Sequence, residues 1–383
     1  MGNELKRLNT FYNPTQNDCG VEIQSMCFVT SVESGYDDPQ HFDQAWNHPD
    51  EEEKIKWRVA IKKEFGDMKK NNVWEPYSVQ NLPPNQVTLG TKWVFKKKSS
   101  GVYRARLVAL GYSQIPGVDY SANFSPVINE TTMRIVLLMM LKNNWTMELI
   151  DIETAFLYGD LEEEIFLKIP SGYNQVVEST TSTDCLKLRK SLYGLVQASR
   201  QWWKHFVKTL KNLNFKRSKI DPCLLMRQDE SGILILCIYV DDVLCIGTSA
   251  SIEKGIKDIL NYFTIKHTKE VKEYVGCSIV RDIKTKKIYF CQPGLINRLE
   301  MEFKNEVDDL KKVETPATPG QIIIRPQPED ELLSNDQQKN IEVGWACCYI
   351  WLSILVRILL TVFVNCQRSW MELRSITIKT YFE

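Results

Sequence analysis

Apolar residues recur every three or four positions in several parts of the chain, which is the spacing of an amphipathic helix. The pattern begins at Glu51 and ends at Asn71-Asn72, returns over residues 132–142 and on one face of 195–213, and appears again from Ser249 to Phe263. These four segments predict helices.

Two other segments resemble strands and carry acidic residues. Residues 147–156 are mostly apolar, with acids at alternate positions, so Asp151 and Glu153 share one face of the predicted strand. Residues 233–247 are two apolar runs separated by Asp241-Asp242, which predicts a tight hairpin. Aspartate is common in turns and needs no chemical role there. An exposed two-residue turn prefers a glycine, however, and these runs are apolar enough to be buried, which weakens a purely structural interpretation.

Two tracts of the chain are basic. Residues 92–97 and 103–110, joined by Ser99-Ser100-Gly101, predict a hairpin, and the stretch from Lys92 to Arg106 has six basic residues and no acidic one. Residues 185–220 contain ten basic residues, five aromatic residues and no acidic one. Several of the aromatics fit the buried face of a helix, and a basic run is often only a solvated surface. A groove that follows a phosphate backbone needs such a field, so both interpretations stay open.

The composition sets limits on the class of protein. The chain has 383 residues, 48 basic and 48 acidic side chains, and 43% hydrophobic residues. This suggests two or three structural units and excludes a collagen-like, mucin-like or wholly disordered chain. The 11 cysteines form no CxxC repeat, and no histidine lies beside a cysteine pair. We therefore expect reduced thiols, an intracellular protein and no zinc site.

Composition also predicts where the folded part begins and ends. Residues 1–45 are polar and irregular, as in a linker or the remnant of a longer polyprotein, and residues 321–340 read as a second linker. Residues 345–364 are mostly apolar and long enough to span a bilayer, but Arg357 lies inside this segment. Membrane association through it is the disfavoured interpretation.

The acidic strands and the basic tracts together indicate one chemistry. Nucleotidyl transfer uses two divalent cations, and Mg²⁺ prefers oxygen ligands from carboxylates, phosphates and water. Asp151 and Asp241-Asp242 can supply such ligands if their strands pair so that the carboxylates converge. The two basic tracts then provide positive charge for a triphosphate and a template.

Seven short motifs follow one another along residues 46–320. They are Lys92-Trp93-Val94-Phe95, Tyr103-Arg104-Ala105-Arg106-Leu107-Val108-Ala109, Gly117-Val118-Asp119-Tyr120, Phe124-Ser125-Pro126-Val127, Asp151-Ile152-Glu153-Thr154-Ala155-Phe156-Leu157, Leu192-Tyr193-Gly194-Leu195-Val196-Gln197-Ala198 and Tyr239-Val240-Asp241-Asp242. In this order they resemble the reverse transcriptases of copia-type retrotransposons. The resemblance implies an α+β fold of the right-hand polymerase type, with fingers at 46–145, a palm with an antiparallel sheet at 146–264, and the start of a thumb at 265–320.

The resemblance also implies roles for individual residues. Asp151 and Asp241 match the ligands of two Mg²⁺ ions, which Mn²⁺ can replace, and Asp242 completes the catalytic acids. Phe156 matches the aromatic gate that rejects a 2′-hydroxyl. The other nucleotide-binding residues implied are Arg104, Arg106, Tyr193 and Gln197. The basic tracts supply the residues expected to bind nucleic acid, which are Lys92, Lys96, Arg200, Lys204 and Lys208.

The implied activity is RNA-directed DNA polymerisation, with an RNA template, a DNA or tRNA-like primer and deoxynucleoside triphosphates as partners. The relatives continue into an RNase H domain and also carry an integrase, which this sequence lacks, and they act in a cytoplasmic virus-like particle or in the nucleus. Residues 341–383 match no motif of the family and form an aberrant apolar tail in this interpretation, for which a frameshift is our hypothesis and a true apolar segment is the alternative. The alternative function is a truncated, catalytically inactive remnant that only binds nucleic acid.

Overall fold

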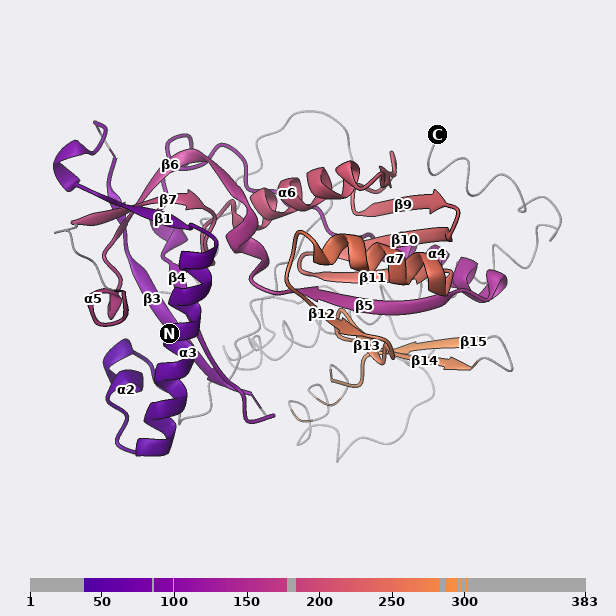
Figure 1. The fold of residues 1–383 in the computed structure, drawn as a ribbon, viewed down its shortest axis with the longest axis horizontal. Coiled ribbons are helices and arrows are strands. Elements are labelled where there is room, and N and C mark those ends of the chain that lie inside the picture. Colours follow the sequence, from indigo (N-terminus) through magenta and orange to yellow (C-terminus); the bar gives the residue numbers. More distant parts are fainter. Residues whose placement is uncertain are drawn as a thin grey trace, which may run out of the picture.

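The computed structural model describes residues 38–301 except 85, 99, 178–183, 283–286, 295–296 and 298–300. The predicted linker at 321–340 and tail at 341–383 lie outside the described residues, as do most of the predicted N-terminal linker and the thumb beyond residue 301. Within the described part, helices and strands form two hydrophobic cores that lie side by side (Figure 1).

The first core packs helix α3 (Glu51–Lys70) against a hairpin of strands β3 (Thr91–Lys97) and β4 (Tyr103–Ala109). The helix begins after Asp50, whose carboxylate accepts a hydrogen bond from the Glu53 N–H at 2.9 Å, and it ends at Lys70, before Asn71. Trp57, Ile61 and Phe65 form its buried face. The structure thus confirms the predicted helix and hairpin.

A four-stranded sheet completes the first core, in the order β1-β7-β6-β2, with only the β2–β6 pair parallel. Its strands are β1 (Trp74–Tyr77), β2 (Thr88–Leu89), β6 (Asp160–Lys168) and β7 (Cys185–Lys190). Short helices accompany it, namely α2 (Phe42–Trp46), η2 (Val79–Asn81), η3 (Gly111–Ser113) and α5 (Tyr173–Val176).

Helix α2 corrects one expectation. The sequence predicted an irregular segment up to residue 45, but Phe42 and Ala45 are buried in the first core. The Phe42 ring stacks on Trp46 at 5.4 Å between centroids and also lies 6.1 Å from Trp93. Two buried residues in a five-residue helix are too few to produce a visible periodicity, so tertiary contacts determine this helix.

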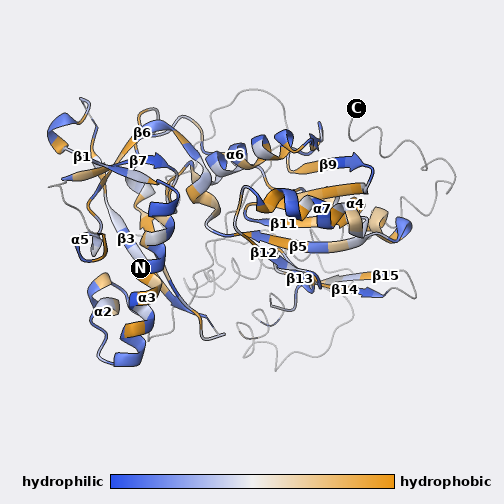
Figure 2. Cartoon of the chain, in the orientation of Figure 1, coloured by the Kyte–Doolittle hydropathy of each residue, from blue (hydrophilic) through white to orange (hydrophobic). Residues whose placement is uncertain are grey.

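The second core surrounds a six-stranded antiparallel sheet in the order β12-β5-β11-β10-β9-β8. The strands are β5 (Thr146–Ile152), β8 (Lys216–Arg217), β9 (Leu224–Asp229), β10 (Gly232–Tyr239), β11 (Asp242–Gly247) and β12 (Ile265–Thr268). Its helices are α4 (Glu130–Asn143), α6 (Ala198–Asn212) and α7 (Ser249–Leu260). The central strands are almost continuously apolar (Figure 2), as expected for strands whose two faces are both covered.

A small sheet follows the six-stranded one along the chain and consists of β13 (Glu273–Tyr274), β14 (Cys277–Asp282) and β15 (Lys287–Cys291). Tyr274 connects it to the second core, because its buried hydroxyl donates a hydrogen bond to the Cys237 carbonyl of β10 at 3.0 Å. In the part of the chain that the structure describes, no helix is both long and apolar enough to cross a membrane. The apolar segment 345–364 lies outside that part.

Two details near the acidic residues differ from the sequence prediction. The strand predicted over 147–156 ends at Ile152, because Thr154 adopts a left-handed conformation (φ +53°) and the chain enters a short 3₁₀ helix, η4 (Ala155–Tyr158). In the predicted hairpin, Tyr239 pairs with Asp242, so the two turn residues are Val240 and Asp241. Asp242 is therefore the first residue of β11 and not part of the turn.

Candidate active site

The pairing of β5 with β11 brings the three predicted acidic residues together. Asp242 lies directly opposite Asp151 in the antiparallel register, and the Ile152 N–H donates a hydrogen bond to the Asp241 carbonyl at 3.0 Å. The turn that carries Asp241 is thus fixed beside the end of β5. The two strands therefore pair so that their carboxylates converge, as the prediction of a metal site from the sequence required.

The turn itself has a strained backbone. Val240 has φ +55°, a left-handed conformation that costs a β-branched residue about 1–3 kcal/mol. Two hydrogen bonds hold this turn in place. The Trp202 indole N–H donates to the Val240 carbonyl at 2.7 Å, and the Ile152 N–H donates to the Asp241 carbonyl. Such strain persists where the surrounding structure over-determines the turn, and it often accompanies functional sites.

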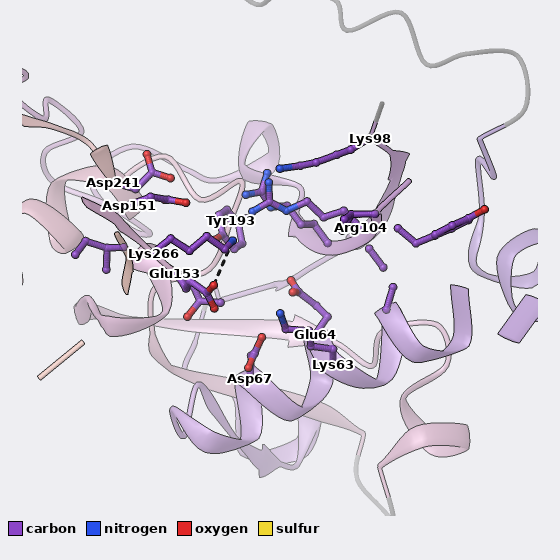
Figure 3. A pocket seen from close by; sticks show the side chains of 17 residues that line it. Lys63, Glu64, Asp67, Lys98, Arg104, Asp151, Glu153, Tyr193, Asp241 and Lys266 are labelled. Atoms are coloured by element: carbon purple, nitrogen blue, oxygen red, sulfur yellow. Dashed lines mark ion pairs between the residues drawn. The ribbon is translucent and has the colours of Figure 1, made fainter. Parts of the chain in front are cut away.

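Asp151 and Asp241 line a cavity of about 140 Å³ between the two cores. Figure 3 shows their carboxylates next to each other on one side of the cavity, with Lys98 and Arg104 reaching toward them from the hairpin. Arg106 and Tyr193 also line the cavity. Five of the predicted site residues, which belong to four separate motifs, therefore line one space, in which the carboxylates of Asp151 and Asp241 face basic residues of the hairpin.

Burial and the charges of neighbouring carboxylates raise the pKa values of Asp241 and Asp242. The pKa of Asp241 lies above its ordinary value, first because the side chain is largely desolvated and then because Asp151 is close. Burial, followed by the charges of Asp241 and Asp151, raises the pKa of Asp242 to about 6. A cation bound between these carboxylates would relieve this repulsion.

The donor set of this cluster suits a hard divalent cation, because it consists of carboxylate oxygens. Among the described residues, no group of three acidic, histidine or cysteine side chains is arranged to hold a metal by itself. Asp151 and Asp241 would therefore supply part of a coordination shell. Phosphate oxygens and water would complete it, as is usual for Mg²⁺.

The basic residues of the hairpin share one face. Lys96 lies opposite Arg104 across the β3–β4 ladder, and Lys92 lies four pairs further on, opposite Val108. Lys92, Lys96 and Arg104 are exposed, whereas Arg106 is half-buried. The charge of Arg104, followed by burial, lowers the pKa of Lys98. A group of cations that repel one another is a suitable site for a polyanion.

Two other predicted nucleotide-binding residues, Arg106 and Phe156, pack against the Tyr193 ring. The guanidinium carbon of Arg106 lies 4.8 Å from the centre of the Tyr193 ring, and the Phe156 ring lies 5.0 Å away at an interplanar angle of 56°. Burial and nearby carboxylates outweigh the opposing effect of Arg106 and raise the pKa of Tyr193 to about 12, so its hydroxyl stays protonated. Phe156 is half-buried within η4 and does not line the cavity itself.

Gln197 is fully buried and does not reach the cavity surface. Its amide nitrogen donates to the Asp119 carbonyl at 2.8 Å, and its oxygen accepts from the Gln114 amide at 3.0 Å. Gln114 in turn accepts from the Val196 N–H at 2.8 Å. This network connects the segment after β4 to the start of α6, so any effect of Gln197 on a nucleotide would be indirect.

The three predicted nucleic-acid-binding residues of α6 lie outside the cavity lining. Arg200 donates to the Phe124 carbonyl at 2.9 Å, Lys204 pairs with Glu162 at 2.7 Å, and Lys208 is exposed. The sequence could not reveal the pair with Glu162, because the acidic strand β6 is about 40 positions away.

Three charged residues that line the cavity, Lys266, Glu64 and Lys98, were not among the predicted site residues. Lys266 of β12 pairs across the sheet with Asp151 and forms an ion pair with Glu153 at 3.2 Å (Figure 3). Glu64 of α3 is 7% exposed and accepts a hydrogen bond from the Leu107 N–H of β4 at 3.2 Å. Lys98 could have been suspected from its place at the end of β3, but Lys266 and Glu64 reach the cavity only through long-range packing.

Comparison with known proteins agrees with this geometry. Residues 71–319 match the family described as "Reverse transcriptase (RNA-dependent DNA polymerase)". The chain is 34% identical over 286 residues to the Retrovirus-related Pol polyprotein from transposon TNT 1-94 of Nicotiana tabacum, which covers 73% of this chain and 21% of the relative.

Two further relatives give the same result. The Retrovirus-related Pol polyprotein from transposon RE1 of Arabidopsis thaliana is 33% identical over 272 residues, covering 69% of this chain and 18% of the relative. The Transposon Ty1-MR1 Gag-Pol polyprotein of Saccharomyces cerevisiae is 27% identical over 310 residues, covering 76% of this chain and 17% of the relative. The chain spans only about a fifth of the length of these polyproteins. It belongs to the reverse transcriptase family, in the branch of the copia-type transposon Pol polyproteins.

Proposed function

We propose that this chain is an RNA-directed DNA polymerase that adds deoxynucleotides to a primer 3′-hydroxyl. The observation that carries the proposal is the cavity in which Asp151 and Asp241 face Arg104 and Arg106. In the proposed right-hand arrangement, the fingers at 46–145 contain α3 and the β3–β4 hairpin, the palm at 146–264 contains β5 to β11, and the start of the thumb at 265–320 contains β12 to β15. The family membership supports this assignment.

The carboxylates and the cations have complementary roles in this proposal. Asp151 and Asp241 would hold two Mg²⁺ ions, or Mn²⁺, which activate the attacking hydroxyl and stabilise the charge on the departing pyrophosphate. Arg104, Arg106 and Lys98 bind the triphosphate from the hairpin side, where charge-assisted hydrogen bonds to phosphate are strong. Asp242, half-buried opposite Asp151, adds negative charge next to the two ligands.

The sugar and the template occupy the neighbouring surfaces. Phe156 acts as the gate beneath the incoming sugar, where its ring would collide with a 2′-hydroxyl. Lys92 and Lys96 contact the nucleic-acid backbone from the exposed face of the hairpin, on which they lie with Arg104. Arg200, Lys204 and Lys208 of α6 contribute to a second backbone contact, in which exposed Lys208 is the most accessible of the three.

Primer extension tests the proposal. The protein is incubated with an RNA template, a DNA primer, deoxynucleoside triphosphates and Mg²⁺, in parallel with Asp241→Asn and with Asp43→Asn, a control at an exposed position on α2. We expect extension by the parent and the control, and a loss of at least about a thousandfold in Asp241→Asn, since metal binding contributes several kcal/mol to such reactions.

Binding of nucleic acid without primer extension would support the alternative function. A folded parent protein that retains primer–template in a filter-binding assay but does not extend the primer would contradict the proposed activity. That result would support an inactive remnant that only binds nucleic acid.

A further inference from the structure

The aromatic ring of Tyr193 contacts two side chains with different proposed tasks, Arg106 and Phe156. Arg106 packs on the ring with its guanidinium carbon 4.8 Å from the centroid, and Phe156 packs on it with 5.0 Å between centroids. A cation over an aromatic ring and a tilted aromatic pair are both attractive arrangements. The three side chains come from β4, from the segment between β7 and α6, and from η4.

The backbone around Tyr193 is fixed on both sides. The Ser191 hydroxyl donates a hydrogen bond to the Phe156 carbonyl, and the Ala109 N–H donates to the Tyr193 carbonyl at 2.7 Å. Gly194 has φ +89°, and a Cβ at this position would lie 2.2 Å from the Ala109 carbonyl oxygen. Only glycine allows this close approach, so the segment is held tightly between β4 and η4.

We propose that Tyr193 is a positioning residue for sugar selectivity, because its ring packs against both Arg106 and Phe156. The inference rests on the proposed function, in which Arg106 holds the triphosphate and Phe156 excludes a 2′-hydroxyl. A gate can reject an extra hydroxyl only if the gate ring cannot retreat and the nucleotide cannot shift away from it. Phe156 is half-buried in a four-residue 3₁₀ helix, so its packing against Tyr193 is an important part of its support.

The test compares incorporation of dCTP and CTP by the parent, Tyr193→Ala, Tyr193→Phe and Tyr262→Ala. Tyr262 is an exposed tyrosine outside the cavity lining and serves as the control. The measured quantity is the ratio of kcat/KM for dCTP to kcat/KM for CTP. A loss of folded protein lowers both values equally and leaves this ratio unchanged, so the ratio separates selectivity from stability.

We expect Tyr193→Ala to lower the ratio about tenfold, which is the scale of one lost aromatic contact. Tyr193→Phe and Tyr262→Ala should keep the parental ratio, because the ring of Tyr193 makes both contacts. An unchanged ratio in Tyr193→Ala would overturn the inference, as would a tenfold loss in Tyr193→Phe, which would assign the effect to the hydroxyl. Absence of extension by the parent would instead contradict the proposed function, and the inference with it.

Discussion

Replacement of Glu64 with glutamine is expected to stabilise the protein much more at pH 8 than at pH 5. Glu64 lies on α3, is 7% exposed, and accepts the Leu107 N–H of β4. Burial raises the pKa of Glu64 from its ordinary value of 4.5 to about 7, and the opposing effects of the Leu107 N–H and Arg106 are smaller. A glutamine oxygen can accept the same hydrogen bond without ever becoming charged.

The direction of the pH dependence follows from proton binding. Below pH 4.5 the carboxyl group is protonated in both the folded and the unfolded states, so the stability that its raised pKa contributes is fully present. As the pH rises from 4.5 to about 7, the unfolded chain releases this proton while the folded protein keeps it, and the free energy of unfolding falls. Above pH 7 the loss is complete.

The magnitude follows from the two pKa values. The gap between 4.5 and about 7, at about 1.4 kcal/mol per pH unit, corresponds to about 3 kcal/mol of lost stability in the parent protein at pH 8. Glu64→Gln should avoid this loss. At pH 5 the carboxyl group is still protonated in the folded protein and only partly ionised in the unfolded chain, so the difference should shrink to less than about 1 kcal/mol.

Urea unfolding followed by tryptophan fluorescence measures this difference, because Trp57 and Trp93 lie in the same core as Glu64. The parent, Glu64→Gln and the exposed control Glu230→Gln are compared between pH 5 and pH 8.5. The reasoning would be refuted if the stability gain of Glu64→Gln over the parent did not increase from pH 5 to pH 8. An equal gain at pH 8 in Glu230→Gln would refute it as well.

Three further predictions concern the site and its surroundings. Arg106→Ala should raise the KM for dCTP about tenfold or more while kcat falls less, because a charge-assisted hydrogen bond contributes about 1.5–3 kcal/mol, and an unchanged KM in steady-state extension would contradict this role. Trp202→Phe removes the indole N–H that holds the strained hairpin turn at 2.7 Å, so thermal unfolding should show a loss of about 1–3 kcal/mol, and an unchanged melting temperature would show that the bond is dispensable. Lys92→Ala with Lys96→Ala should make the slope of log K against log salt for primer–template binding less negative by about 2, whereas Lys204→Ala, which removes a paired lysine, should change it less, and a reversed order would assign the backbone contact to α6.

The sequence predicted correctly those helices and hairpins whose residues lie close together along the chain. Helix α3 was predicted from its apolar period, the β3–β4 hairpin from two short strands joined by a turn, and the β10–β11 hairpin from two apolar runs, and the structure contains all three. The convergence of Asp151 with Asp241 was predicted only conditionally, because the pairing of β5 with β11 is a long-range event that neither strand encodes by itself.

The remaining features depend on tertiary contacts. The end of β5 was placed four residues too late, since the left-handed conformation of Thr154 is not visible in an apolar pattern. Lys266 escaped notice because its place opposite Asp151 requires β12 to join the sheet. Conversely, Lys204 was expected to bind nucleic acid because it lies in an acid-free stretch of the sequence, but it is paired with Glu162 of a distant strand.

The register between β5 and β11 has a consequence for how this chain tolerates mutation. Leu149 faces Leu244 and Met147 faces Ile246 in the same ladder that sets Asp151 opposite Asp242. A shift of one residue would turn every side chain of one strand to the other face, so the apolar pairs fix the spacing of the acids without touching them. Exchanges among similar apolar residues should therefore leave the acids in place. Insertion or deletion of a single residue in the two-residue turn would displace them. The number of residues in this hairpin is thus constrained more strictly than the identity of its core residues.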